Sequence, residues 1–139
     1  MSHDLSSFRR QLHELQQQLP SLLDAFLGRE PLLPGSVYTL HRRCGKPTCH
    51  CVQGERHAST VLSYRGQGRP QNITAPPEHL FAVRKLTDDY RQFRQARTQL
   101  LQVQRQILKL IDDIEAARVQ EGERRFQKLR ATFPPHFRK

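Results

Sequence analysis

The chain has little of the material that builds a large hydrophobic core. It contains no tryptophan and a single methionine, only 36% of its 139 residues are hydrophobic, and its mean hydropathy is -0.73. This composition excludes a large globular core. The apolar residues that are present recur at regular intervals, which favours helices that each bury one stripe.

Long hydrophobic runs and a disulfide framework are also absent. No run of about 18 apolar residues occurs, so the sequence predicts no membrane-spanning helix. The first residues, MSHDLSSFRRQL, lack the apolar centre of a secretory signal. Three cysteines cannot all pair within one chain, and all three lie within residues 44–51. We therefore expect thiolate chemistry in a reducing, cytoplasmic setting.

Positive charge is abundant and unevenly distributed. The chain carries 23 Lys and Arg against 13 Asp and Glu, a net charge of +10. Residues 41–70 hold six cations and one acid, and residues 118–139 hold seven cations and two acids. Such an excess predicts a polyanionic partner, nucleic acid with DNA favoured. A merely solubilising surface is the alternative interpretation.

Residues 1–34 are predicted to form an N-terminal helix and a linker. Asp4 or Ser2 is placed to cap the helix. Pro20 lacks a backbone donor and disfavours helix at the preceding residue, so we expect a kink or a brief break there. Alternating spacings of three and four mark the apolar stripe of this helix, whose members are Leu5, Phe8, Leu12, Leu15, Leu19, Leu22 and Phe26.

Residues 76–121 are predicted to form a long helix of coiled-coil type, which Gly122 ends, and residues 122–139 a basic tail. The seam of the long helix consists of Phe93, Ala96, Leu100, Val103, Ile107, Leu110, Ile114 and Ala117. Leu101, Leu108 and Ile111 widen the apolar face beyond what a single partner helix covers. The sequence therefore predicts a homodimer through the helices.

The hydrophobic period changes between the two helices. Residues 36–42 and 59–65 are short, β-branched and aromatic-rich, and residues 71–74 complete a third strand after a tight turn. Residues 35–75 thus form a predicted zinc-binding β-hairpin module. The expected fold class is α+β, mostly α, with a small zinc-stapled antiparallel β-sheet between the N-terminal helix and the long C-terminal helix.

The cysteines follow the pattern C-x4-C-x-C-x5-H. Four soft or borderline ligands at this spacing suit a closed, structural Cys3His zinc site, and a chain with so thin a core gains from such a cross-link. The predicted ligands are Cys44, Cys49, Cys51 and His57. His50 and His41 are alternative fourth ligands, and three reduced cysteines without metal are the alternative to zinc. Glu55 is the only carboxylate nearby, so no enzymatic activity is expected.

Residues 35–65 resemble a widespread prokaryotic family of small proteins of unknown function. The similarity rests on the core R-x-C-G-K-x-x-C-x-C, here residues 42–51, followed by a histidine and the strand sequence Leu-Ser-Tyr-Arg. Many members are found near transposases, so the resemblance implies a role with mobile elements. Residues 58–60, Ala-Ser-Thr, depart from the glycine–proline–aromatic stretch of many relatives, which puts an aromatic surface there in doubt.

Cations and aromatic residues around the cysteines complete the functional hypothesis. Tyr38 and Tyr64 are placed either to stack on bases or to pack the sheet. We expect a zinc-stabilised nucleic-acid-binding accessory factor, associated with a transposase or recombinase and located at the nucleoid if it binds DNA. The alternative is a protein-interaction adaptor that works through its helical arm. The predicted phosphate-binding residues are Arg42, Arg43, Lys46, Arg56, Arg65 and Arg69 in the module and Arg124, Arg125, Lys128 and Arg130 in the tail.

Overall fold

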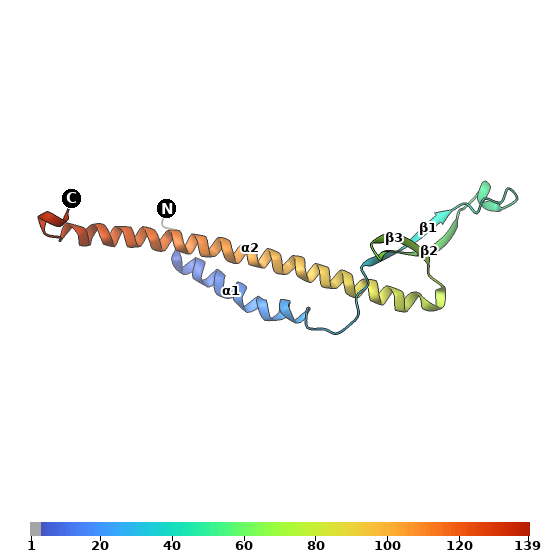
Figure 1. Ribbon diagram of the computed structural model, residues 1–139, viewed down its shortest axis with the longest axis horizontal. Coiled ribbons are helices and arrows are strands. Elements are labelled where there is room, and N and C mark those ends of the chain that lie inside the picture. The colour runs from blue at the N-terminus through green and yellow to red at the C-terminus, as the bar shows by residue number, and fades with distance from the viewer. Residues whose placement is uncertain (1–3) are drawn as a thin grey trace. The chain divides into compact units, whose positions relative to one another are not determined.

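A computed structural model describes residues 4–139 and shows the predicted α+β fold (Figure 1). The main elements in chain order are α1 (Leu5–Asp24), β1 (Gly35–Arg42), β2 (His57–Gly66), β3 (Arg69–Thr74) and α2 (Leu80–Ala131). Short 3-10 turns occur at His50–Val52, Pro77–His79 and Pro135–Phe137. The chain divides into a helical unit, residues up to Ala25 with Arg97–Lys139, and a sheet unit, Phe26–Ala96. None of the described helices combines the length and the apolarity that crossing a membrane requires.

Helix α1 begins at a side-chain cap. The Asp4 carboxylate accepts a hydrogen bond of 3.0 Å from the backbone N–H of Ser6, which satisfies one of the free donors of the first turn. Ser2, the other candidate cap, lies outside the described residues. Of the kink and the brief break expected at Pro20, the break is not found, because Leu5–Asp24 is one helix that contains this residue. Pro20 and Gln16 are both exposed, so water can serve the carbonyl that proline leaves without a donor.

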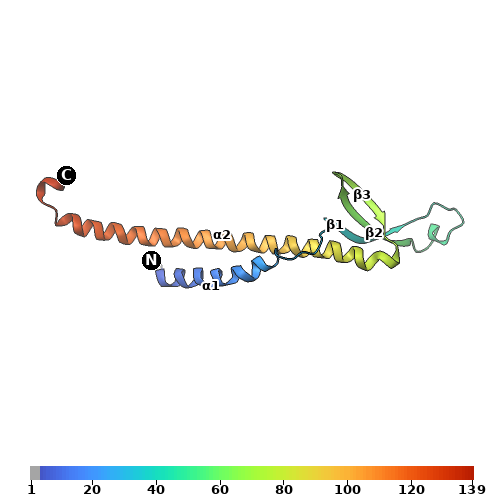
Figure 2. The ribbon, with the colours of Figure 1, turned by 60° about the horizontal axis from the view of Figure 1, so that its bottom comes forward.

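Helix α1 lies alongside α2 within the helical unit, and both views show the two helices side by side (Figures 1 and 2). The predicted seams are the covered faces. Every member of the α1 stripe is half-buried, and on α2 the residues Val103 and Leu110 are buried. The two helices therefore bury one stripe each, as their periodicity predicts.

Helix α2 is longer than predicted. The expected end at Gly122 is wrong, since the helix continues to Ala131 and extends about 78 Å at ~1.5 Å per residue. A single glycine costs a helix interior only about 1 kcal/mol relative to alanine, which does not stop a helix of this length. The helix ends just before Pro134, which cannot continue it. Residues 122–131, predicted as tail, are therefore helical.

The sheet unit contains a three-stranded antiparallel sheet in the order β1-β2-β3. Its strands match the predicted ones with ends shifted by two residues or fewer. Positive φ angles at Gln67 (55°) and Gly68 (78°) form the tight β2–β3 turn. Val61 and Leu62 of β2 are buried, and so is Thr87 of α2. The central strand thus carries the small core of this unit.

The linker after α1 is held to the first part of α2. The rings of Phe26 and Phe93 meet edge-on with centroids 5.1 Å apart. The backbone N–H of Leu33 donates to the carbonyl of Leu86 at 3.1 Å. Linker, sheet and the beginning of α2 are thereby joined in one unit.

Candidate metal centre

The predicted ligands lie where β1 ends and β2 begins. Arg42 of β1 pairs with His57 of β2 as the last pair of the ladder, and residues 43–56 form the loop between them. His57 therefore stands at the base of the loop that carries Cys44, Cys49 and Cys51. Strand pairing, and not closeness in sequence, brings the histidine to the cysteines.

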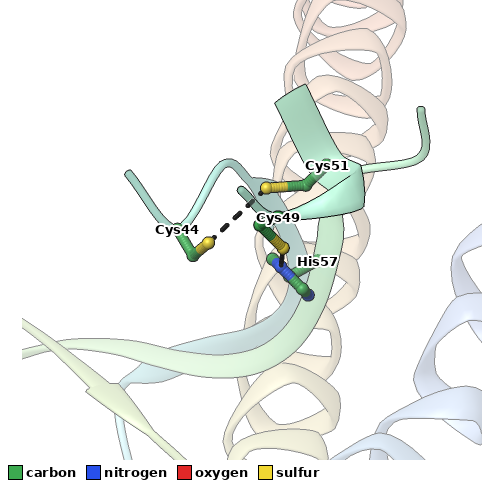
Figure 3. A group of neighbouring side chains, drawn as sticks. All are labelled: Cys44, Cys49, Cys51 and His57. Atoms are coloured by element: carbon green, nitrogen blue, oxygen red, sulfur yellow. Dashed lines mark hydrogen bonds between the residues drawn. The ribbon is translucent and has the colours of Figure 1, made fainter. Parts of the chain in front are cut away.

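The ligand atoms of Cys44, Cys49, Cys51 and His57 all lie within 4.8 Å of one another (Figure 3). The sulfurs of Cys44 and Cys51 are 3.6 Å apart, and the Cys49 sulfur is 3.1 Å from Nε2 of His57. A tetrahedral zinc site with Zn–S bonds of about 2.3 Å separates its sulfurs by about 3.8 Å. The group thus has the composition and the size of a four-ligand metal site.

Tight turns aim the cysteines at one another. Gly45 has a φ of +81°, a conformation that few residues other than glycine adopt. The N–H of Cys49 donates to the carbonyl of Lys46 at 3.2 Å, and the N–H of Val52 donates to the carbonyl of Cys49 at 3.2 Å. These two turns place Cys49 at the start of the 3-10 turn His50–Val52 and Cys51 within it.

The electrostatic environment differs among the thiols. A backbone hydrogen bond from Cys51, followed by the hydrogen bond with His57, lowers the pKa of Cys49 to about 6. The pKa of Cys51 is raised: a backbone hydrogen bond from Cys44 acts to lower it, but burial and the neighbouring sulfurs outweigh this effect. The cluster favours one thiolate readily and resists further negative charge unless a cation joins it. A divalent metal would supply that charge.

The alternative histidines lie outside the four-ligand group. His50 is close, with Nδ1 3.8 Å from the Cys49 sulfur and its ring edge-on to that of His57 at 5.2 Å. His41 lies in β1, where it pairs with Ala58. Sequence reasoning did not foresee that His50 would neighbour His57. The signal available in the sequence was that His50 directly follows Cys49.

The predicted phosphate-binding residues of the module divide into two groups. One group lies in or beside the loop of residues 43–56, called the metal loop below, and consists of Arg42, Arg43, Lys46 and Arg56. The other group, Arg65 and Arg69, flanks the β2–β3 turn at the other end of β2. That strand of ten residues separates the groups by about 30 Å at ~3.3 Å per residue. All six are exposed. The six residues predicted to bind phosphate in the module therefore form two separate basic patches.

Some of the cations on α2 form ion pairs with neighbouring carboxylates. Lys85 pairs with Asp89 at 2.9 Å on α2, and Arg124 and Arg125 both pair with Glu121. Arg130 donates to the carbonyl of Arg138 at 3.1 Å, and Lys128 is exposed. Among the described residues, no carboxylate pairs with the four cations of the metal loop. Those four are free to meet an external anion.

The two tyrosines have different environments. The Tyr64 hydroxyl donates to Oε1 of Gln71 at 3.0 Å, and a Cβ at Gly66 would come within 2.9 Å of the Tyr64 ring. Tyr64 is therefore a packing residue of the sheet. Tyr38 is 39% exposed, so its ring is available at the surface.

The fold and site define a small Cys3His module attached to a long helix. A family model described as a domain of unknown function, DUF6788, matches residues 5–85, more than half of the chain, so the chain belongs to that family. The match covers α1, the sheet, the metal loop and the first turns of α2. No curated protein and no solved structure gives a significant match.

Proposed function

We propose that the chain is a zinc-stabilised nucleic-acid-binding accessory factor, with DNA as the favoured ligand. The observation that carries the proposal is the group of three sulfurs and one imidazole nitrogen within 4.8 Å. A cysteine-rich site of this kind suits a reducing compartment, so the proposal places the protein in the cytoplasm, and at the nucleoid if it binds DNA.

Zinc is the metal that this ligand set suits best. Three thiolates with one imidazole are typical of closed tetrahedral zinc sites, in which the protein supplies all four ligands and leaves no position for a substrate. The loop also needs a cross-link, because Cys51 is the only buried residue and Cys49 the only half-buried one in residues 43–56. The role proposed for the metal is structural, and the protein is not proposed to be an enzyme.

The unpaired cations of the loop support nucleic-acid binding. Zinc with three thiolates and one histidine keeps one surplus negative charge. The surrounding side chains carry more positive charge than is needed to neutralise it, and they are Arg42, Arg43, Lys46 and Arg56. A metal-fixed loop would present these side chains to phosphates in a defined arrangement. The genomic association implied by the sequence signature suggests a transposase or recombinase as the protein partner.

Metal analysis of paired histidine variants tests the zinc centre. Purified protein is expected to contain one zinc ion per chain. His57→Ala should lose most of it, whereas His50→Ala, which removes a neighbouring histidine outside the group, should keep it. Retention of full zinc by His57→Ala would show that the ligand assignment is wrong.

Salt-dependent binding to duplex DNA tests the proposed ligand. Fluorescence anisotropy with labelled DNA should show affinity that falls linearly on a log–log plot against salt. Arg43→Gln should reduce the slope by about 0.9 if that residue contacts one phosphate. Arg91→Gln is the matched control, since Arg91 lies 3.5 Å from Asp88 on α2. The same titration with RNA distinguishes the two nucleic acids.

A protein-interaction adaptor is the second candidate function. The exposed apolar residues of α2, among them Leu108 at 60% and Leu129 at 58%, favour it because they offer a protein-binding surface. The adaptor predicts no DNA binding even at low salt. Absence of binding in the anisotropy experiment would support this function over the first.

A further inference from the structure

Helix α2 carries a second apolar stripe that α1 does not cover. Six of its large apolar side chains are between 40% and 60% exposed: Leu101, Leu108, Ile111, Val119, Phe126 and Leu129. At about 100° per residue, all six fall within a sector of roughly 80°. The centre of that sector lies about 100° around the helix from the seam that faces α1. The exposure is therefore one continuous stripe and not a scatter of side chains.

The middle of this stripe is acidic and its C-terminal part is basic, whereas its beginning carries Arg105 and Lys109. Residues 111–117 contain three carboxylates and no cation, whereas residues 119–131 contain four cations and two carboxylates. A parallel copy in the same register would set acid against acid and base against base. An antiparallel copy centred between residues 118 and 119 sets the acidic segment 111–117 against the basic segment 119–131. The charge pattern thus selects both the partner and its direction.

We propose that the stripe is the interface with a second copy of this chain, in antiparallel orientation. A two-fold axis beside residues 118 and 119 places Leu108 opposite Leu129 of the second copy. The same register places Ile111 opposite Phe126. Two apolar pairs, each formed twice by symmetry, thus arise from one register.

The interface is separate from the metal site. It lies entirely within the helical unit, and the family match ends at residue 85, before the stripe begins. Polar residues interrupt the stripe at Gln104 and Glu115. In the proposed register Glu115 faces Gly122, beside Arg118 and Arg125, so the carboxylate has cations within reach.

Light scattering coupled to size exclusion tests self-association. The chain has a mass of 16.3 kDa, and at micromolar concentration the protein should run at twice that mass. Leu108→Glu should shift it to the monomer with its zinc content unchanged. Gln102→Glu, which adds the same charge to an exposed position on the opposite side of the helix, should remain dimeric. A wild-type monomer would overturn the proposal whatever the outcome of the DNA experiment.

Photo-cross-linking tests the direction. Benzoylphenylalanine incorporated at position 108 should cross-link to the peptide that contains Leu129. Within one helix these positions are about 32 Å apart, so such a product must join two chains. Cross-links from position 108 to residues 104–112 of the second copy would show a parallel dimer and refute the antiparallel arrangement.

Discussion

The metal loop and the helical unit differ in what holds their backbone in place. In the loop, residues 43–56, only Cys51 is buried, and the contacts are a few turns and the close group of three thiols and one imidazole that could hold a metal ion. In the helical unit, repeated side chains bury two seams along continuous hydrogen-bonded helices. The loop therefore depends on a single centre, whereas the helical unit spreads its stability over many small contacts. The same kind of change should have unequal effects in the two regions.

Metal removal should produce the largest difference between the regions. A strong zinc chelator, or Cys44→Ser, should remove the ion and with it a binding free energy that reaches about 10–16 kcal/mol in zinc-finger peptides. Hydrogen exchange should then lose protection in the loop and at the adjoining ends of β1 and β2. Helix content measured by circular dichroism should change little. Equal loss of protection in α2 would show that the two regions are not independent.

Truncation of a seam residue should have the next largest effect, and it should be confined to the helices. Leu110 is 8% exposed, so Leu110→Ala should lower the free energy of unfolding by about 2–3 kcal/mol. Leu23 of α1 is 46% exposed, and Leu23→Ala should cost less than about 1 kcal/mol. Denaturant unfolding followed by circular dichroism measures both. Zinc content should be unchanged in either variant.

A glycine-to-alanine change should be unfavourable in the metal loop and stabilising in the helical unit. At Gly45 the φ of +81° strains alanine by about 1–2 kcal/mol, so Gly45→Ala should weaken zinc binding. Gly122 lies inside α2 with no atom within 4 Å of an added Cβ, so Gly122→Ala should stabilise the helix by about 1 kcal/mol. Competition with a chromogenic chelator measures the first variant, and thermal unfolding the second. A gain in both zinc affinity and thermal stability, or a loss in both, would contradict the comparison.

The helix cap should give the smallest effect. Asp4→Ala removes the acceptor of the Ser6 N–H and should cost about 0.5–1 kcal/mol in thermal unfolding. Asp24 closes the same helix at its other end, where a negative charge faces the negative end of the helix dipole. Asp24→Ala should therefore cause no loss. A loss as large as that of Asp4→Ala would argue against capping as the cause.

Much of the fold and of the site could be predicted because it depends on local patterns. The spacing of apolar residues located both helices and their seams, and β-branched runs located the strands to within two residues. The ligand set followed from the chemistry and closeness of Cys44, Cys49 and Cys51. The predicted end at Gly122 and the alternative of a break at Pro20 were wrong because a local breaker was weighed without its surroundings. Pro20 and Gly122 each sit on exposed helix positions, where the helix tolerates them.

The arrangement of the cations could not be predicted from their order in the sequence. Residues 42–69 read as one basic segment, yet β2 runs the length of the sheet and carries Arg65 away from Arg42. Distances between residues far apart in the chain follow from strand register, which local sequence does not encode.

The sequence by itself determined the two amphipathic helices, the short strands and the soft ligands, because each depends on residues within a few positions of one another. The sequence predicted His57 as the fourth ligand with His50 and His41 as alternatives, and only the tertiary structure decided among them, since the pairing of Arg42 with His57 brings His57 to the cysteines. It also decided which apolar face of α2 is covered by α1 and which is left exposed. Both outcomes depend on contacts between distant segments, where packing and not local preference selects the geometry.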